Sequence, residues 1–488
     1  MAKKILAIDI GTSSTKAALF NPTGIVELVA EAKHPIANAG PGRQEQDATD
    51  WWRSTCTAVQ QLGNLSNVVA VTLSGTMQNV IPLGQDGESL RPAILYGDSR
   101  ASTEFEFLSP MLASMGASRI IGNQPNEFMA AFKMQWMLKN EPDVFKRTCM
   151  IHFGAKDYII YRLTGTHVTD PTAATAVGLM DLAARCWHPD LLRLFGMPVE
   201  KLPDIRPSRS IAGHIKEEAA GELGLPAGTP VINGLGDAGA STIGAGVTET
   251  GQAYIYLGTT AWVASVTDLA SATIPRQSFV LAHAEAGKVI EVAPLLSGGD
   301  CIEWLLGTFG GDLRNLADRM PIVDASPPDL LFLPYLKGER SPFIDTAVRG
   351  GFLMLDRTHG LPEMFYAVME GVSVLLRANV DSLGVTADRI RLLGGGGLSD
   401  IWPQLIADAT ERMIEVADEP GIAPAFGAFC EAAHVLDWSQ PRHRFERCVS
   451  PRSERSARGE RRRRIFLAAT AFARTLNGVP DKPVAIDR

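Results

Sequence analysis

The sequence predicts an α/β protein of two large domains. The chain has 488 residues, which is too long for one ordinary core. Buried-type strands alternate with helical segments, the pattern that defines α/β folds. A strand, a short turn containing Gly-Thr and a second strand occur at the start of the chain and again near its middle. This recurrence indicates two related halves, although so short a match also arises by chance.

The first half is predicted to open with a hairpin. Strands are expected at Ile5–Ile8 and Lys16–Phe20, on either side of the segment Asp9-Ile10-Gly11-Thr12-Ser13. A helix is expected at Asp50–Leu62, with Asp50 as its N-cap, followed by a strand at Val68–Leu73. Helical patterning fills residues 126–164, and a further strand is expected at residues 231–233.

The second half repeats the opening pattern. Strands at Ala253–Leu257 and Ala261–Val266 flank the turn Gly258-Thr259-Thr260. We therefore place the boundary after residue 246 and expect domains at residues 1–246 and 247–488. A strand at residues 389–393, the four glycines 394–397 and a helix at residues 401–410 follow, with Ser399 or Asp400 as the helix N-cap.

Composition excludes several classes of function. The net charge is −8 and the pI is near 5.7, so general nucleic-acid binding is not expected. No apolar run is long enough for a membrane span, and the N-terminus does not resemble a signal peptide. The six cysteines form no Cys-x-x-Cys pair, so free thiols in a reducing cytoplasm are expected.

One stretch near the C-terminus is rich in arginine. Seven arginines and two glutamates lie between Pro451 and Arg464. The stretch has two interpretations, a contact with an anion or nucleic acid and a solvated helix face. We favour the solvated face, because the run is short and the chain is acidic overall.

The opening hairpin is a candidate phosphate site. A tight turn of small residues presents backbone N–H groups and hydroxyls to a phosphate, and Gly11 permits close approach of the backbone. Asp9 ends a buried strand, and a carboxylate there suits Mg²⁺, which is usually held by one or two carboxylates and phosphate oxygens. The alternative is a plain β-turn with a capping aspartate. A Walker A loop is excluded, because the required Gly-x-x-x-x-Gly-Lys is absent.

Three further segments complete a candidate site. Gly258-Thr259-Thr260 forms the second candidate phosphate turn. The glycines 394–397 are costly to order, which favours backbone packed against a nucleotide over a flexible loop. Asp237 lies among small residues, where a carboxylate can accept the proton of an attacking hydroxyl. Its alternatives are a helix N-cap and a metal partner.

With these elements in this order, the chain resembles the FGGY carbohydrate kinases, and within them most closely the xylulokinases. The resemblance covers residues 4–420. It rests on the segments Asp9–Lys16, Ser74-Gly75-Thr76-Met77, Leu90–Arg100, Lys156-Asp157-Tyr158, Arg162–Gly165, Gly236-Asp237-Ala238, Gly258-Thr259-Thr260, Pro334–Pro342, Arg349-Gly350 and Gly394–Asp408. It implies two actin-like ATPase (ribonuclease H-like) domains with a central cleft, and transfer of the γ-phosphate of ATP to a small sugar with the help of Mg²⁺.

The resemblance also implies residue roles. Asp237 matches the catalytic base, and Asp9 matches the metal-associated acid. The sugar is expected near Met77, Gln78, Asp98 and Asp237. The implied ATP-binding residues are Asp9, Gly11, Thr12, Ser13, Lys16, Gly258, Thr259, Thr260, Gly395, Gly396, Ser399 and Gln404. A homodimer is implied by resemblance only.

The sugar loop departs from the xylulokinase pattern. Xylulokinases typically read Ser-Gly-Gln-Met-His-Gly, whereas this chain reads Ser74-Gly75-Thr76-Met77-Gln78-Asn79. D-xylulose is the favoured substrate, and glycerol, gluconate and ribulose stay open as alternatives. A non-catalytic ATP- or sugar-binding regulator and a chaperone-type or cytoskeletal actin-like ATPase are the remaining alternatives. Asp9 and Asp237 argue against the regulator, and the sugar-loop elements and Pro334–Pro342 argue against the other ATPases.

Overall fold

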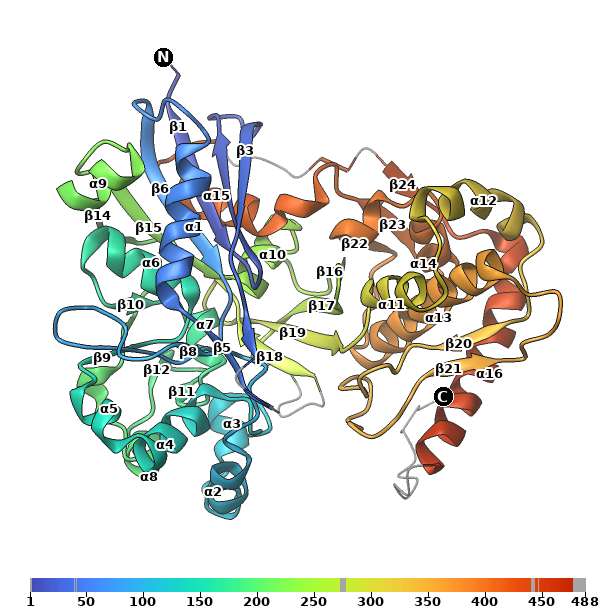
Figure 1. The fold of residues 1–488 in the computed structure, drawn as a ribbon, viewed down its shortest axis with the longest axis horizontal. Coiled ribbons are helices and arrows are strands. Elements are labelled where there is room, and N and C mark those ends of the chain that lie inside the picture. The colour runs from blue at the N-terminus through green and yellow to red at the C-terminus, as the bar shows by residue number, and fades with distance from the viewer. Residues whose placement is uncertain are drawn as a thin grey trace.

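In the computed structural model, two domains lie side by side, and each is built around one mixed β-sheet (Figure 1). The structure describes residues 2–38, 40, 42–272, 278–439, 444–445 and 447–476. None of the helices in these residues combines the length and the hydropathy that a membrane span requires. The predicted α/β fold with two domains is confirmed.

The sheet of the first domain has six strands in the order β14-β15-β6-β1-β2-β3. Its central strands β15, β6 and β1 are parallel, while β2 and β3 continue from β1 as an antiparallel meander. The strands are β1 (Lys4–Ile10), β2 (Ser14–Phe20), β3 (Val26–Lys33), β6 (Val68–Gly75), β14 (Ile211–His214) and β15 (Pro230–Gly236). Both faces of this sheet are covered by apolar residues.

The sheet of the second domain repeats this topology. Its seven strands have the order β18-β19-β17-β16-β22-β23-β24. Strand β16 pairs antiparallel with β17 and parallel with β22, as β1 pairs with β2 and β6, so the predicted recurrence extends to the strand order. The strands are β16 (Ala253–Leu257), β17 (Ala261–Asp268), β18 (Phe279–Ala282), β19 (Lys288–Leu295), β22 (Arg389–Leu393), β23 (Met413–Val416) and β24 (Arg447–Val449).

Helices cover the first sheet, and a smaller lobe of helices extends below it (Figure 1). The helix predicted at Asp50–Leu62 forms two residues earlier, because Asp47 rather than Asp50 caps it by accepting the N–H of Thr49. The helices are α1 (Ala48–Gln60), α2 (Ser102–Ser114), α3 (Ala117–Ile121), α4 (Ala130–Asn140), α5 (Pro142–Arg147), α6 (Ala155–Thr164), α7 (Pro171–Thr175), α8 (Pro189–Phe195), α9 (Glu217–Leu223) and α10 (Asp237–Gly244), with the 3₁₀ helix η1 (Val199–Lys201). Short strands join them: β4 (Ala37–Asn38), β5 (Gln44–Gln46), β7 (Ile81–Leu83), β8 (Ala93–Ile94), β9 (Met150–His152), β10 (Val168–Thr169), β11 (Met180–Asp181), β12 (Cys186–Trp187) and β13 (Asp204–Ile205).

One helix of the second half packs on the sheet of the first domain. Helix α15 (Ala423–Val435) lies beside β1 in Figure 1, and the ring of Phe429 stacks on that of Phe20 at 4.5 Å. It crosses α10 at Gly427, where a Cβ atom would lie 1.9 Å from the carbonyl oxygen of Ala240. The close crossing therefore requires glycine and joins the two halves beside Asp237. The other elements of the second half are α11 (Asp300–Phe309), α12 (Leu313–Ala325), β20 (Leu331–Leu333), β21 (Gly351–Leu353), α13 (Leu361–Ser382), η2 (Gly395–Leu398), α14 (Trp402–Thr410), η3 (Pro420–Ile422), η4 (Ser453–Arg455) and α16 (Ser456–Thr475).

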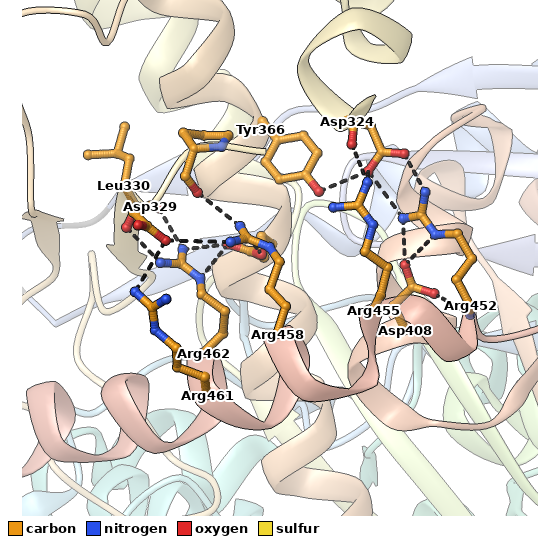
Figure 2. A network of polar contacts seen from close by, with 12 residues as sticks. Asp324, Asp329, Leu330, Tyr366, Asp408, Arg452, Arg455, Arg458, Arg461 and Arg462 are labelled. Atoms are coloured by element: carbon orange, nitrogen blue, oxygen red, sulfur yellow. Dashed lines mark hydrogen bonds and ion pairs between the residues drawn. The ribbon is translucent and has the colours of Figure 1, made fainter. Parts of the chain in front are cut away.

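The arginine-rich stretch is packed against the second domain, so the predicted solvated helix face is wrong. Figure 2 shows its arginines reaching carboxylates and carbonyls of α12, α13, α14 and the segment before β20. Arg452 donates to Asp408 at 2.8 Å, and Arg458 donates to Glu370 at 3.1 Å. Arg462 is 2% exposed. Composition did not reveal this docking, because the acidic partners lie far from the arginines in the sequence.

Candidate active site

Three parallel strands carry candidate residues to one edge of the first sheet. Asp9 on β1 lies opposite Ser74 on β6, and Gly75 lies opposite Gly236 on β15. The segments that follow these strands therefore emerge together, although the sequence separates them widely. In α/β sheets this edge, at the carboxyl ends of the strands, is where ligands bind.

Asp237 is the first residue of α10, directly after β15. Its Oδ1 accepts the N–H of Ala238 at 2.8 Å. Burial raises the pKa of Asp237 to about 7, and the negative charge of Asp9 acts in the same direction. A carboxylate with such a pKa is suited to accept a proton near neutral pH.

Asp9 has the properties of a metal-associated acid. Its Oδ1 is buried and has no hydrogen-bond partner among the residues that the structure describes. Burial raises the pKa of Asp9, while the Ser74 hydroxyl and the Lys16 charge lower it. A buried carboxylate oxygen without a donor is suited to a hard cation, so the residues present fit Mg²⁺.

The first hairpin is braced from behind by two side chains that the sequence did not indicate. His34 Nε2 donates to the carbonyl of Gly11 at 3.1 Å, and Gln46 Nε2 donates to the carbonyl of Thr12 at 2.9 Å. Burial lowers the pKa of His34, which favours its neutral form. Because these carbonyls are occupied, the opposite side of the turn is left for its N–H groups and hydroxyls.

The second hairpin, between β16 and β17, is braced by the residues at the start of α11. The N–H of Gly299 donates to Gly258 O at 2.8 Å, and the N–H of Asp300 donates to Thr259 O at 3.0 Å. Burial raises the pKa of the neighbouring Tyr256, and the negative charges of Asp9 and Asp237 raise it further. The start of this hairpin therefore lies near both acids of the first domain.

The four glycines have more than one purpose. Gly394 has a φ of 86°, and a Cβ there would lie 2.5 Å from Leu257 O. A Cβ on Gly396 would lie 2.4 Å from the Leu257 side chain. Packing against β16 therefore explains these two glycines, whereas a Cβ on Gly395 would meet no atom of the described residues within 4 Å. Neither predicted cap is the N-cap of α14, which is Ile401 and makes no side-chain cap bond. The Ser399 Oγ nevertheless accepts the N–H of Trp402, the first residue of that helix, at 3.2 Å.

The sugar loop lies against the peptide that precedes Asp237. A Cβ on Gly236 would lie 2.1 Å from the sulfur of Met77, so these residues are in direct contact. Gln78 has a φ of 63°, and its Nε2 is buried without a hydrogen-bond partner among the described residues. That amide is therefore available to a ligand.

Lys133 on α4 holds this loop and was not predicted. Its Nζ donates to Leu95 O at 2.6 Å and to Gln78 O at 3.3 Å. Burial lowers the pKa of Lys133 to about 7. The residue thus ties the sugar loop to the segment that leads to Tyr96, whose hydroxyl lies 3.4 Å from Thr12 Oγ1.

Three other predicted residues use their polar groups within the chain. The Asp98 carboxylate accepts from Arg100 Nε at 2.8 Å and from the N–H of Gln44 at 2.7 Å. Lys16 Nζ donates to Gly421 O at 2.9 Å, and Gln404 Nε2 donates to Ser450 O at 3.0 Å. The structure thus brings together Asp9, both hairpins, Met77, Gln78 and Asp237. The side chains of Asp98, Lys16 and Gln404 instead bind other groups of the protein.

The duplicated domains, with a hairpin from each and an acid of raised pKa, form the arrangement of a phosphoryl-transfer enzyme. The sequence matches the N-terminal domain of the FGGY family of carbohydrate kinases over residues 4–244 and its C-terminal domain over residues 253–436. The chain belongs to this family and is a carbohydrate kinase. Segments β24 and α16 lie beyond the matched region.

Relatives and solved structures agree with this assignment. The chain is 30% identical to a xylulose kinase of Escherichia coli (strain K12) over 433 residues, 87% of this chain and 88% of the relative. It is 25% identical to a gluconokinase of Bacillus subtilis (strain 168) over 437 residues, 86% of this chain and 85% of the relative. A crystal structure of xylulose kinase from Rhodospirillum rubrum superposes with a TM-score of 0.86 and 26% identity, covering 98% of this chain and 100% of the other.

Proposed function

We propose that the enzyme transfers the γ-phosphate of ATP to D-xylulose, forming D-xylulose 5-phosphate, with Asp237 as the general base. The observation that carries the proposal is the position of Asp237, a carboxylate with a pKa raised to about 7 beside the sugar loop and Asp9. The xylulose kinases of several bacteria among the relatives support the choice of sugar.

In the proposed mechanism, the β- and γ-phosphates of ATP bind between the turns 11–13 and 258–260. The adenosine lies toward Gly395 and Ser399. The sugar lies against Met77 and Gln78 with its terminal hydroxyl directed at the γ-phosphorus. Asp237 accepts the hydroxyl proton as the oxygen attacks in line and the β-phosphate leaves. Mg²⁺ held by Asp9 and the phosphates would neutralise the charge that develops on the phosphate oxygens.

A second candidate substrate class is favoured by one observation. The free amide of Gln78 replaces the histidine typical of xylulokinases, and it can both donate and accept hydrogen bonds. Sugar acids and polyols such as gluconate and glycerol therefore remain in the proposal, and the gluconokinase relative supports them. A cytoplasmic location, a place in xylose metabolism and a homodimer complete the proposal, and the free thiols of all six cysteines fit the first of these.

The test is an ADP-release assay with D-xylulose, ribulose, glycerol and gluconate as acceptors. We expect turnover on D-xylulose, and a higher kcat/KM on another acceptor would overturn the choice of sugar. Asp237→Asn should lower kcat by about 10²–10⁴-fold, the range for loss of a general base. Asp268→Asn, an exposed aspartate on β17, is the matched control and should leave kcat unchanged. Normal turnover by Asp237→Asn would refute the assignment of the base.

A further inference from the structure

Beneath Asp237 lies a buried group of three charges. Lys156, Asp157 and Asp170 are all fully buried, and Lys156 Nζ lies 2.7 Å from Asp157 Oδ1 and 3.1 Å from Asp170 Oδ2. Buried charges are costly unless they are paired, so this group is held in one arrangement. Asp170 is the member that reaches the candidate site.

The two oxygens of Asp170 bind different segments. Oδ1 caps α7 by accepting the N–H of Thr172 at 2.9 Å. Oδ2 accepts the N–H of Gly236, the residue directly before Asp237, at 3.1 Å. A single carboxylate thus connects the start of α7 to the backbone that carries the proposed base.

Helix α7 in turn contacts the second domain. The Thr172 hydroxyl donates to Ala282 O at 2.7 Å, and the N–H of Ala282 donates to Thr175 Oγ1 at 3.1 Å. Ala282 is the last residue of β18, the edge strand of the second sheet. Helix α7 also contacts α10, since a Cβ on Gly239 would lie 2.9 Å from Thr172 Oγ1.

We propose that Asp170 is a positioning residue for the phosphoryl transfer. It holds the peptide before Asp237 in place and links it, through α7, to strand β18 of the second domain. A shift of the second domain, which carries one phosphate hairpin, would therefore also shift the backbone that holds the base. This inference rests on the proposed role of Asp237.

The charge of Asp170 also acts on Asp237. The titratable and charged groups that face Asp237 are Asp9 from β1, Asp170 before α7, and Tyr254 and Tyr256 from β16. Asp170 raises the pKa of Asp237, after the larger effects of burial and Asp9.

Asp170→Asn is the decisive variant, because asparagine keeps an oxygen for the cap of α7 but places an amide donor against the N–H of Gly236. We expect kcat to fall by about tenfold to a hundredfold, the scale for a small misplacement of a reacting group. The KM for ATP and for sugar should stay within about threefold, because substrate binding does not depend on the exact position of the base. A kcat within about twofold of wild type would overturn the proposal.

Three comparisons separate this role from others. Asp312→Asn makes the same change at the exposed N-cap of α12, where Asp312 accepts the N–H of Asn315, and should leave kcat and both KM values unchanged. Asp157→Asn breaks the same charged group but leaves the bond to Gly236, so its effect should be smaller than that of Asp170→Asn. Turnover by Asp237→Asn would instead refute the proposed base, whatever Asp170→Asn does.

A folding failure of Asp170→Asn, seen by calorimetry, would leave the decision to Thr172→Val. This variant removes the hydroxyl that reaches Ala282 O and retains the side-chain shape. We expect kcat to fall by about threefold or more, since a hydrogen bond contributes on the order of 1 kcal/mol. A kcat equal to that of wild type would then overturn the link to the second domain.

Discussion

Replacement of Arg462 by methionine tests whether the arginine-rich stretch holds the second domain together. The Arg462 side chain is buried, and its Nε donates to Glu370 Oε2 at 2.9 Å. Its terminal nitrogens donate to Asp329 O at 2.7 Å and to Leu330 O at 2.6 Å (Figure 2). Methionine keeps much of the apolar stem and removes all of these donors.

The expected loss follows from these contacts. Removal of one partner of a buried ion pair costs about 3–5 kcal/mol. Glu370 keeps Arg458 at 3.1 Å, so we expect the lower end, about 3 kcal/mol. For a domain of this size each kcal/mol moves Tm by about 2–4 °C, which gives a fall of about 6–12 °C.

Differential scanning calorimetry measures this change, with Arg464→Met as the control on the same helix. Arg464 is exposed and forms no ion pair with the residues that the structure describes, so its replacement should change stability by less than about 0.5 kcal/mol. Equal Tm values for the two variants would refute the reasoning, because burial and pairing would then make no difference.

Three further predictions concern the site. Since burial raises the pKa of Asp237 to about 7 and the base must be ionised, kcat should fall about tenfold per pH unit below that value; a flat profile down to about pH 5 would contradict this. Lys133→Met should raise the KM for sugar about tenfold while the KM for ATP stays within about threefold. Steady-state kinetics that show equal changes in the two KM values would argue against a specific role of Lys133 in the sugar loop. Lys139→Met is the control for this variant, because Lys139 lies half-exposed on the same helix. Gly394→Ala should lower Tm markedly, because Gly394 has a φ of 86° and a Cβ there would meet Leu257 O. Gly395→Ala should leave Tm unchanged and raise the KM for ATP. A lower Tm for Gly395→Ala than for Gly394→Ala would refute the packing account.

Much of the fold was predictable because its signals are local. Apolar runs marked the strands β1, β2, β16 and β17, and small residues marked the hairpins between them. The predicted N-cap Asp50 was wrong by three positions. Asp47 and Asp50 are the same residue type near the helix start, and only the folded geometry selects Asp47. The residues of helix α15 are mostly apolar, but their sequence does not say that the helix packs on the sheet of the other domain.

The candidate site was only partly predictable. Asp9, Asp237 and the hairpins stand out by residue type and spacing. Lys133 and Asp170 do not, because charged side chains usually lie at the surface and nothing in the sequence marks these two as buried. The same limit explains the wrong prediction for the arginine-rich stretch, whose partners include Asp324 and Glu370.

The sequence by itself determined the α/β class, the two Gly-Thr turns and the acids available for chemistry, since these depend on residue type and local pattern. The tertiary structure decided which of them meet. Parallel pairing of β1, β6 and β15 brings Asp9, the sugar loop and Asp237 to one edge. It also decided the raised pKa of Asp237, because burial and the charges of Asp9 and Asp170 come from distant segments and act only once the chain has folded.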